Sequence, residues 1–327
     1  MTDSSQAIRR PAKSRKVTKI KQGRFILVFL ALPILLYAYL VVFPLAEMFR
    51  ISFTDWSGLS PDFSYVGFDN YIDMWSDPKG WVVPGFWHTG IMLLVLPVAV
   101  IVLALFFAFM LNVGGRGTGK ITGVKGASFY KIVYFFPQVL SLIVIAILWR
   151  QIYAGPSDGG VLANVLSSLG LPSPESGFIN EESMVLPAVI VAMIWASVGF
   201  YFVYFSAAMS GIPEELYEAA RIDGASRTTT FFKITLPLLW DSVQTAWVYL
   251  GIIALDGFVL VYAMTPGAGG GGPNHASEVI GGVIFKFALG DGRNAGMGSA
   301  LGVIVFLFMS VVTVVFLRAT RRDRVEY

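Results

Sequence analysis

Long apolar stretches alternate along this chain with shorter polar connections. A hydrocarbon core about 30 Å thick is crossed by about 20 helical residues. Six stretches reach that length, and they cover residues 25–45, 86–111, 129–149, 184–209, 238–264 and 297–317. None of them alternates with the two-residue period of a membrane β-barrel. The pattern therefore predicts an all-α polytopic membrane protein with six transmembrane helices.

Four of these stretches contain internal proline, and among these prolines are Pro33, Pro97, Pro137 and Pro187. Membrane helices tolerate internal proline because neighbouring helices and polar side chains satisfy the freed backbone groups. We therefore expect all six stretches to span the bilayer as parts of one transmembrane region over residues 25–318, with tails at 1–24 and 319–327.

Composition supports a membrane protein, since 55% of the residues are hydrophobic and only 14% are charged. A soluble domain carries about 25% charged residues, and much of its surface must face water. The chain has no cysteine and only two histidines, which lie far apart. Disulfides and thiolate chemistry are excluded, and a zinc site is disfavoured. Soluble enzymes and disulfide-rich secreted proteins are thus ruled out.

Charge predicts the orientation in the membrane. Most of the 24 Lys and Arg residues fall in the two tails and in the second-to-third and fourth-to-fifth connections. Cytoplasmic segments are enriched in Lys and Arg, so both termini are predicted to be cytoplasmic. Most acidic residues fall in the other connections, and Glu278 and Lys286 are among the charges predicted to lie outside.

The predicted cytoplasmic loop at residues 211–237 has the pattern of a helix, a turn and a second short helix. Pro213 suits a first helical turn, and the acidic Glu214 and Glu215 complement the helix dipole. Gly224 permits a sharp break before a second helix that ends near Pro237. Amphipathic connectors that only rest on lipid headgroups have a similar pattern.

Particular residues of this loop resemble a family signature. They are Glu218-Ala219-Ala220, then Gly224, Ile234 and Leu236-Pro237 at fixed spacing. This pattern resembles the EAA loop of ABC-transporter permeases, and the string IPEELYEAARIDGAS with ITLP resembles the maltose-type sugar permeases. The resemblance implies a type I ABC importer permease fold, in which this loop docks on the ATPase and couples its closure to the membrane helices.

The resemblance also assigns roles within the loop. Glu218 would make the charged contact with the ATPase, Ala219 and Ala220 would allow close approach, and Gly224 would form the turn. The remaining predicted coupling residues are Asp223, Arg227, Ile234, Leu236 and Pro237.

The resemblance extends over roughly residues 25–318. It includes Tyr65–Tyr71, Phe135-Phe136-Pro137 with Leu148-Trp149-Arg150, Gly298-Ser299-Ala300, and Thr265 with the external-loop residues Gly271, Gly272 and Pro273.

The resemblance implies several partners in a bacterial-type plasma membrane: an extracytoplasmic binding protein that delivers a sugar, a second homologous permease and two ATPases. ATP and magnesium would bind to the ATPases, and this subunit would hold no cofactor or metal. A glycine-rich segment at Gly114–Lys120 does not change this interpretation. Ile121 stands where a P-loop needs Ser or Thr.

Asp256 lies deep in the fifth predicted span. A charge at mid-helix costs roughly 2.5–3.5 kcal/mol on insertion scales, so it should face water or a partner. It would either line the solute path and accept hydrogen bonds from sugar hydroxyls, or form an inter-helix hydrogen bond that aids packing. Further candidates for the path, each of which could equally serve packing, are Gln138, Ser141, Trp195, Tyr201, Tyr204, Trp247 and Phe258.

Two other functions compete with an ABC permease. A stand-alone secondary transporter of a small polar solute would favour inverted repeats and several buried acids, and neither is evident in the sequence. An intramembrane enzyme needs a paired constellation of catalytic side chains, and none is apparent. The chain is therefore predicted to be a permease and not an enzyme.

Overall fold

The computed structural model describes residues 19–77, 79–112, 127–265, 270–290 and 293–319. Both predicted tails lie largely outside these residues, as does the Gly114–Lys120 segment. Among the described residues there is no strand, only an isolated bridge between Thr54 and Tyr65. The described part of the chain is thus helical, as its apolar pattern predicts.

The chain divides into two compact units, Met1–Arg50 and Ile51–Tyr327. The first unit contains α1 (Lys19–Tyr37), which continues through a π-helical turn at Ala38–Val42 into α2 (Phe43–Ile51). Pro33 lies inside α1 without ending it. The longer helices of the second unit are α4 (Val82–Asn112), α6 (Leu142–Ile152), α8 (Val185–Ser210), α12 (Trp240–Leu255) and α15 (Ala295–Ala319).

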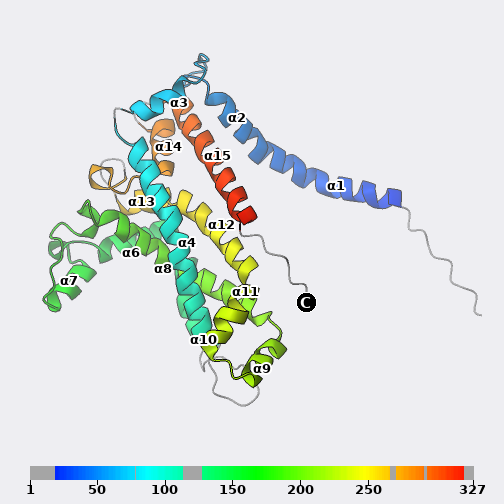
Figure 1. The fold of residues 1–327 in the computed structure, drawn as a ribbon. Coiled ribbons are helices and arrows are strands. Elements are labelled where there is room, and N and C mark those ends of the chain that lie inside the picture. The colour runs from blue at the N-terminus through cyan, green and yellow to red at the C-terminus, as the bar shows by residue number, and fades with distance from the viewer. Residues whose placement is uncertain (1–18, 78, 113–126, 266–269, 291–292, 320–327) are drawn as a thin grey trace, which may run out of the picture. The chain divides into compact units, whose positions relative to one another are not determined.

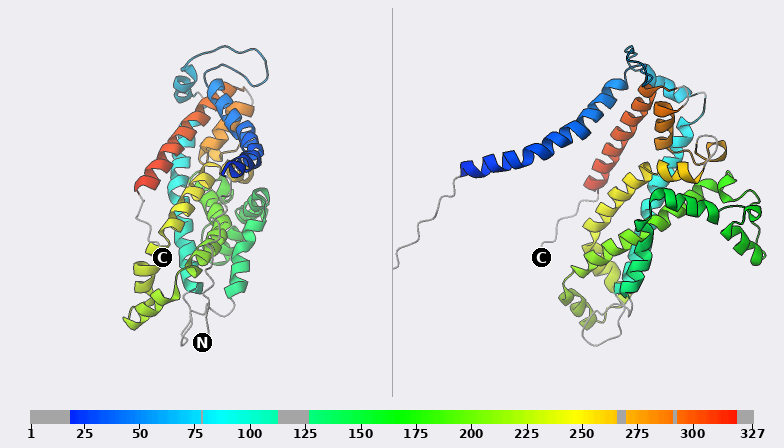
Figure 2. Two further views of the ribbon diagram at one scale, coloured as in Figure 1. Left: turned by 90° about the vertical axis from the view of Figure 1, so that its right-hand side faces the viewer. Right: turned by 180° about the vertical axis from the view of Figure 1, so that it is seen from behind.

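The core of the second unit forms where α4 packs along α8 and α12 (Figures 1 and 2). Small buried residues recur every four positions on α8, at Ala188, Ala192 and Ala196. Small side chains let membrane helices approach closely and gain dispersion energy. At Gly199 the approach is closer still, because a Cβ there would overlap the backbone oxygen of Tyr134 on α5 (Ala127–Phe135).

A second, smaller cluster of buried residues lies where the start of α4 meets α14 (Ile280–Leu289) and α15. It includes Val82, Val283 and Leu301. The short α3 (Asp69–Asp73) leads into this region, where Asn70 donates hydrogen bonds to the backbone oxygens of Ser52 and Thr54 at 2.9 and 2.8 Å. The cluster joins segments that are more than 200 residues apart in the sequence.

Two of the six predicted spans are bent. Four lie on continuous apolar helices: Phe25–Ile51, Val82–Leu111, Val185–Ser210 and Ala295–Ala319. The third coincides with Phe129–Val139 and Leu142–Ile152, which meet at 100°, and the fifth begins in a pair bent by 69° between Leu238 and Trp240. The count of six spans remains a prediction.

The bend in the third span has a local cause. Pro137 lacks an N–H, and the chain passes through a 3₁₀ turn at Phe136–Val139. Ser141 then adopts an extended conformation and its hydroxyl accepts from the N–H of Val144, which caps the start of α6. The fifth span breaks again at Asp256, between α12 and α13 (Phe258–Met264).

Candidate functional site

The loop at 211–237 forms the predicted helix, turn and second short helix. Helix α9 (Glu214–Ile222) begins after Pro213, and Gly224 adopts a left-handed conformation with φ of +73°. The N–H of Gly224 donates to the oxygen of Arg221, and that of Ala225 to the oxygen of Ala220, at 3.0 and 2.9 Å. This pattern ends a helix sharply and turns the chain, which is the role predicted for Gly224.

The second half of the loop continues from α10 (Arg227–Thr230) through a π-helical turn, Phe231–Thr235, into α11 (Leu236–Leu238). Ser226 caps α10 by accepting from the N–H of Thr229 at 3.1 Å. The hydroxyl of Tyr217 on α9 lies 3.2 Å from that of Thr235 in the π-helical turn. Burial raises the pKa of Tyr217, so the phenol stays neutral and can donate this bond. The two halves of the loop are therefore joined by a side-chain contact.

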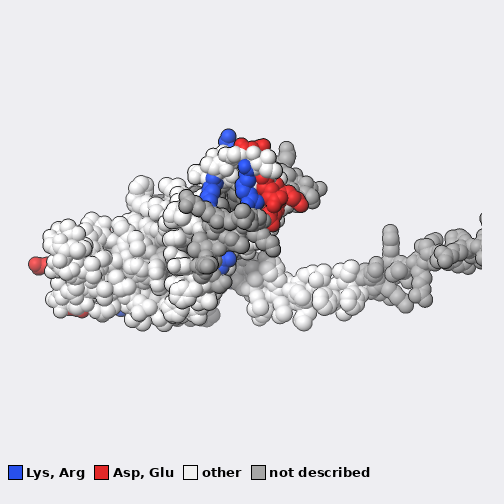
Figure 3. Space-filling model, turned by 90° about the horizontal axis from the view of Figure 1, so that it is seen from below, with Lys and Arg blue, Asp and Glu red and all other residues white. Residues whose placement is uncertain are grey.

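Helix α9 leaves one face uncovered. Glu218 and Ala219 are exposed, whereas Ala220 is buried against the loop. Arg221 lies 3.8 Å from Glu218, and acidic and basic side chains gather at this end of the second unit (Figure 3). Ile222 is 87% exposed, an unusual position for so apolar a side chain. The sequence reasoning missed Ile222, although its place beside Asp223 and Gly224 could have indicated it.

The other predicted coupling residues lie along the same segment. Asp223 ends α9, Arg227 begins α10, Ile234 lies in the π-helical turn, and Leu236 and Pro237 begin α11. Asp223, Arg227 and Pro237 are exposed, while Ile234 and Leu236 are half-buried.

The predicted path residues Asp256 and Gln138 line the same cavity. It holds about 190 Å³ of water-accessible space between the bend of the third span, α8 and the break after α12, and Ser197 also lines it. Asp256 is exposed to this space at the point where α12 ends. The amide of Gln138 donates to the backbone oxygen of Ala196 at 2.6 Å. The helix breaks thus place polar groups at a cavity, as the functional interpretation of Asp256 requires.

A second cavity of about 530 Å³ shares Gln138 and Ile253 with the first. Two of the predicted path residues, Tyr201 and Tyr204 of α8, line it together with Tyr249 of α12. Tyr249 was not among the predicted residues. It lies one helical turn before Ile253, and both residues line this cavity. Aromatic rings beside an amide can stack on the apolar faces of a sugar while hydroxyls bond to its polar edge.

Four predicted path residues do not line either cavity. Ser141 caps α6 instead. The rings of Trp195, Trp247 and Phe258 pack against Trp149, Phe316 and Phe285, with centroids 5.7, 5.5 and 5.6 Å apart. For these three aromatic residues the structure favours packing between helices.

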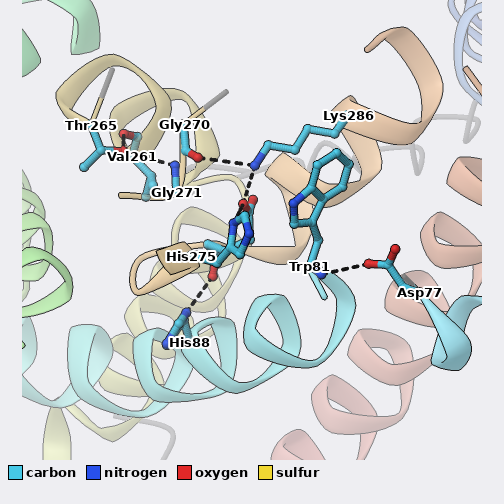
Figure 4. Close-up of polar contacts among 10 residues, drawn as sticks. Asp77, Trp81, His88, Val261, Thr265, Gly270, Gly271, His275 and Lys286 are labelled. Atoms are coloured by element: carbon cyan, nitrogen blue, oxygen red, sulfur yellow. Dashed lines mark hydrogen bonds and ion pairs between the residues drawn. The ribbon is translucent and has the colours of Figure 1, made fainter. Parts of the chain in front are cut away.

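The predicted external loop folds around a buried ion pair. Gly271 and Gly272 have φ of +89° and +71°, and a side chain at Gly271 would meet the carboxylate of Glu278. Glu278 pairs with Lys286 of α14 (Figure 4). Their side chains are only 2% and 8% exposed, so these two charges, which the sequence predicts on the outer side of the membrane, are buried within the protein. Pro273 begins a short 3₁₀ turn after the glycines.

Several groups stabilise this ion pair. Lys286 Nζ lies 3.3 Å from the backbone oxygen of Gly270 and 4.8 Å above the ring of Trp81. The ring of His88 donates to the backbone oxygen of Glu278 at 2.9 Å (Figure 4). Burial raises the pKa of the Glu278 carboxyl, and the adjacent Lys286 opposes the rise. The sequence did contain a signal for this pair. Two opposite charges lie eight residues apart, with Glu278 just before an apolar helix and Lys286 inside it.

The family described as binding-protein-dependent transport system inner membrane component matches residues 90–324. The diacetylchitobiose uptake system permease protein of Streptomyces coelicolor is 39% identical, with 93% of this chain and 83% of that protein covered. The multiple sugar-binding transport system permease protein of Streptococcus mutans is 29% identical, with 91% and 95% covered.

Among solved structures, a bacterial ABC transporter involved in the import of the acidic polysaccharide alginate is similar in fold. The TM-score is 0.77 at 20% identity, with 94% of this chain and 99% of that chain covered. The alginate transporter in complex with an alginate pentasaccharide-bound periplasmic protein gives 0.75 at 21% identity, with 94% and 98% covered. These likenesses confirm the predicted fold class.

Proposed function

Because this chain belongs to the family of binding-protein-dependent transport system inner membrane components, we propose that the solute its importer carries is a sugar. The chain is a membrane-embedded permease of an ABC importer. Curated relatives named for the uptake of diacetylchitobiose and of multiple sugars support a sugar as the solute. Diacetylchitobiose is the first sugar to test, since its permease is 39% identical over nearly the whole chain.

The proposal includes the remaining subunits. An extracytoplasmic binding protein delivers the sugar, a second permease completes the path, and two ATPases supply the energy. A solved relative in fold was captured with a periplasmic protein that carries a pentasaccharide, which supports the first of these partners. The family membership also argues against a stand-alone secondary transporter and against an enzyme.

Helix α9 is the proposed docking element for the ATPase, at the cytoplasmic face that the Lys and Arg distribution predicts. The observation that carries this is the exposed face with Glu218 and Ala219 beside the 87% exposed Ile222. An apolar side chain left in water gains about 1.5–3 kcal/mol when a partner covers it. Tyr217 and Thr235 connect α9 to the π-helical turn that leads into α12, so a displacement of α9 reaches the broken fifth span.

The proposed solute path includes both cavities. Asp256 and Gln138 would accept and donate hydrogen bonds to sugar hydroxyls, and the tyrosines of the second cavity would contact the sugar rings. Asp256→Ala should raise the solute concentration for half-maximal uptake, whereas Trp247→Phe, which lies outside both cavities, should not. Equal kinetics in the two variants would remove Asp256 from the path.

Substitution of Glu218 tests the coupling role. Glu218→Lys should abolish ATP-driven uptake in reconstituted vesicles while the protein still inserts and co-purifies with the second permease. Arg221→Ala is the matched control: it breaks the same 3.8 Å contact but keeps the acid. An exposed pair of this kind contributes only about 0.2–0.5 kcal/mol to a helix. Normal uptake with Glu218→Lys would refute docking through this residue, and uptake driven by an ion gradient without ATPase would refute the importer.

A further inference from the structure

A large open pocket lies at the end of the second unit that is predicted to face outward. It has a volume of about 810 Å³ and is formed by the start of α4, the segment before α8 and the loop around Asn274 and His275. We call it the outer pocket. It lies apart from the two cavities of the proposed solute path, and it shares no residue with either.

The rim of the outer pocket carries uncompensated negative charge. Glu181 accepts a hydrogen bond from Ser176 at 2.8 Å, and Glu182 accepts one from Asn274 at 3.0 Å. No Lys or Arg lines the pocket, and neither glutamate forms an ion pair within the described part of the chain. Neutral donors orient these carboxylates but leave their charge, which favours a cationic occupant.

The outer pocket is also lined by exposed apolar side chains. Trp87 is 69% exposed and Val83 is 62% exposed, and both lie on the first turns of α4. Tryptophan is enriched among the residues that dominate protein–protein binding, and the face of its ring attracts the cation of Lys or Arg. The pocket thus combines an aromatic anchor with an acidic rim.

The third wall is held rigid by the buried ion pair. Asn274 and His275 adopt left-handed conformations, with φ of 48° and 62°, which are uncommon outside glycine. His275 lies 3.8 Å from the carboxylate of Glu278, which pairs with Lys286, and His88 of the pocket bonds to the backbone of Glu278 (Figure 4). A wall fixed before binding loses little conformational entropy when a partner arrives.

We propose that the outer pocket is the socket for a projecting basic segment of the extracytoplasmic binding protein. A Lys or Arg of that segment lies between Trp87 and the carboxylates of Glu181 and Glu182. The inference rests on the proposed function, because that function brings a binding protein to this face. Beyond that function, the inference identifies the surface of the permease that receives the binding protein and the chemistry that recognises it.

The test uses the complete importer in lipid nanodiscs with its sugar-loaded binding protein. ATPase activity is measured against binding-protein concentration at two ionic strengths. The double variant Glu181→Lys/Glu182→Lys should raise the half-saturating concentration about tenfold or more, since like charges across an interface cost over 1.4 kcal/mol. The neutral variant Glu181→Gln/Glu182→Gln should give a smaller rise, and salt should weaken the unmodified importer more than this variant.

The control is Glu175→Lys, which reverses an exposed acid in the same loop outside the pocket. It should saturate like the unmodified importer. Co-purification of all subunits checks assembly, and Trp87→Ala, which should also raise the half-saturating concentration, provides a second variant if the double reversal fails to assemble. The proposal would be overturned if the double reversal and Trp87→Ala both reached half-saturation at the same binding-protein concentration as Glu175→Lys.

Two other results have distinct meanings. A changed dependence on sugar, with an unchanged dependence on binding protein, would make the pocket part of the solute route and overturn the socket. An unmodified importer whose ATPase does not respond to any binding protein would refute the proposed function, and the socket with it.

Discussion

Removal of Lys286 should destabilise the predicted external loop by about 3–5 kcal/mol. The Lys286→Met substitution keeps most of the side-chain volume but leaves the carboxylate of Glu278, only 2% exposed, without its cation. Breaking a buried pair from one side costs about this much, because the remaining charge stays desolvated. The contact with the ring of Trp81, at 4.8 Å, is also lost and contributes about 0.5–2 kcal/mol of the total.

The double variant Glu278→Gln/Lys286→Met should recover most of that loss. Replacing both partners of a buried pair with neutral groups of similar shape is often nearly neutral. Lys79→Met is a matched control, since Lys79 also lies over the ring of Trp81, at 4.6 Å, but is exposed. We expect the control to change stability by no more than about 0.5 kcal/mol.

Hydrogen–deuterium exchange of α14 in the reconstituted importer measures this effect. The N–H of Ile280 donates to Thr89 at 2.9 Å, so its protection reports on this region. Lys286→Met should reduce protection about a hundredfold or more, because each 1.4 kcal/mol is tenfold. A loss below about 1 kcal/mol, or a double variant as unstable as the single one, would refute the reasoning.

The loss in Lys286→Met should depend on pH. Burial already raises the pKa of Glu278, and removal of the cation raises it further. A carboxyl with a raised pKa in the folded state adds stability that is complete below its unfolded pKa of about 4.5 and is lost as pH rises through the folded pKa. The variant should therefore approach the unmodified protein as pH falls and diverge from it as pH rises through the raised pKa of Glu278.

Two further predictions concern the helix packing and the loop at residues 211–237. Gly199→Ala should destabilise the purified importer by about 1–3 kcal/mol, measured by thermal unfolding, because the new Cβ overlaps the backbone of Tyr134. Gly211→Ala is the control and should be tolerated, because its Cβ would meet only one backbone oxygen, at 3.4 Å. Tyr217→Phe removes the bond to Thr235 and should cost the loop about 0.5–1.5 kcal/mol, seen as faster limited proteolysis of residues 211–237; an unchanged cleavage rate would show that the bond contributes nothing.

Local signals were sufficient for much of this protein. Runs of about 20 apolar residues predict helices because backbone groups in lipid must be satisfied within the segment. In the loop, the acids that follow Pro213 and the single Gly224 predict the helix and its end, since caps and left-handed turns depend on a few adjacent residues. The resemblance carried by Glu218-Ala219-Ala220 led to the family that the comparisons confirm.

Only some of the predicted path residues line the two cavities. Asp256, Gln138, Tyr201 and Tyr204 line the two cavities, whereas Trp247 packs on another ring. In an apolar span, the face that meets lipid and the face that meets another helix carry similar side chains, because both surroundings are apolar. The sequence therefore gives little indication of which face is which. Which face of such a helix meets a cavity is therefore decided by its neighbours.

The sequence by itself determined the helices, the family and the helix–turn–helix form of the loop at residues 211–237, because each depends on residues that are close together in the chain. Only the tertiary structure decided that Glu278 and Lys286 are buried together and that His88, 190 positions before Glu278, bonds to its backbone. It also decided that Glu181, Glu182 and Trp87 share one pocket. Such contacts follow from how the bent spans cross and pack, and their geometry is set by sterics summed over many distant side chains.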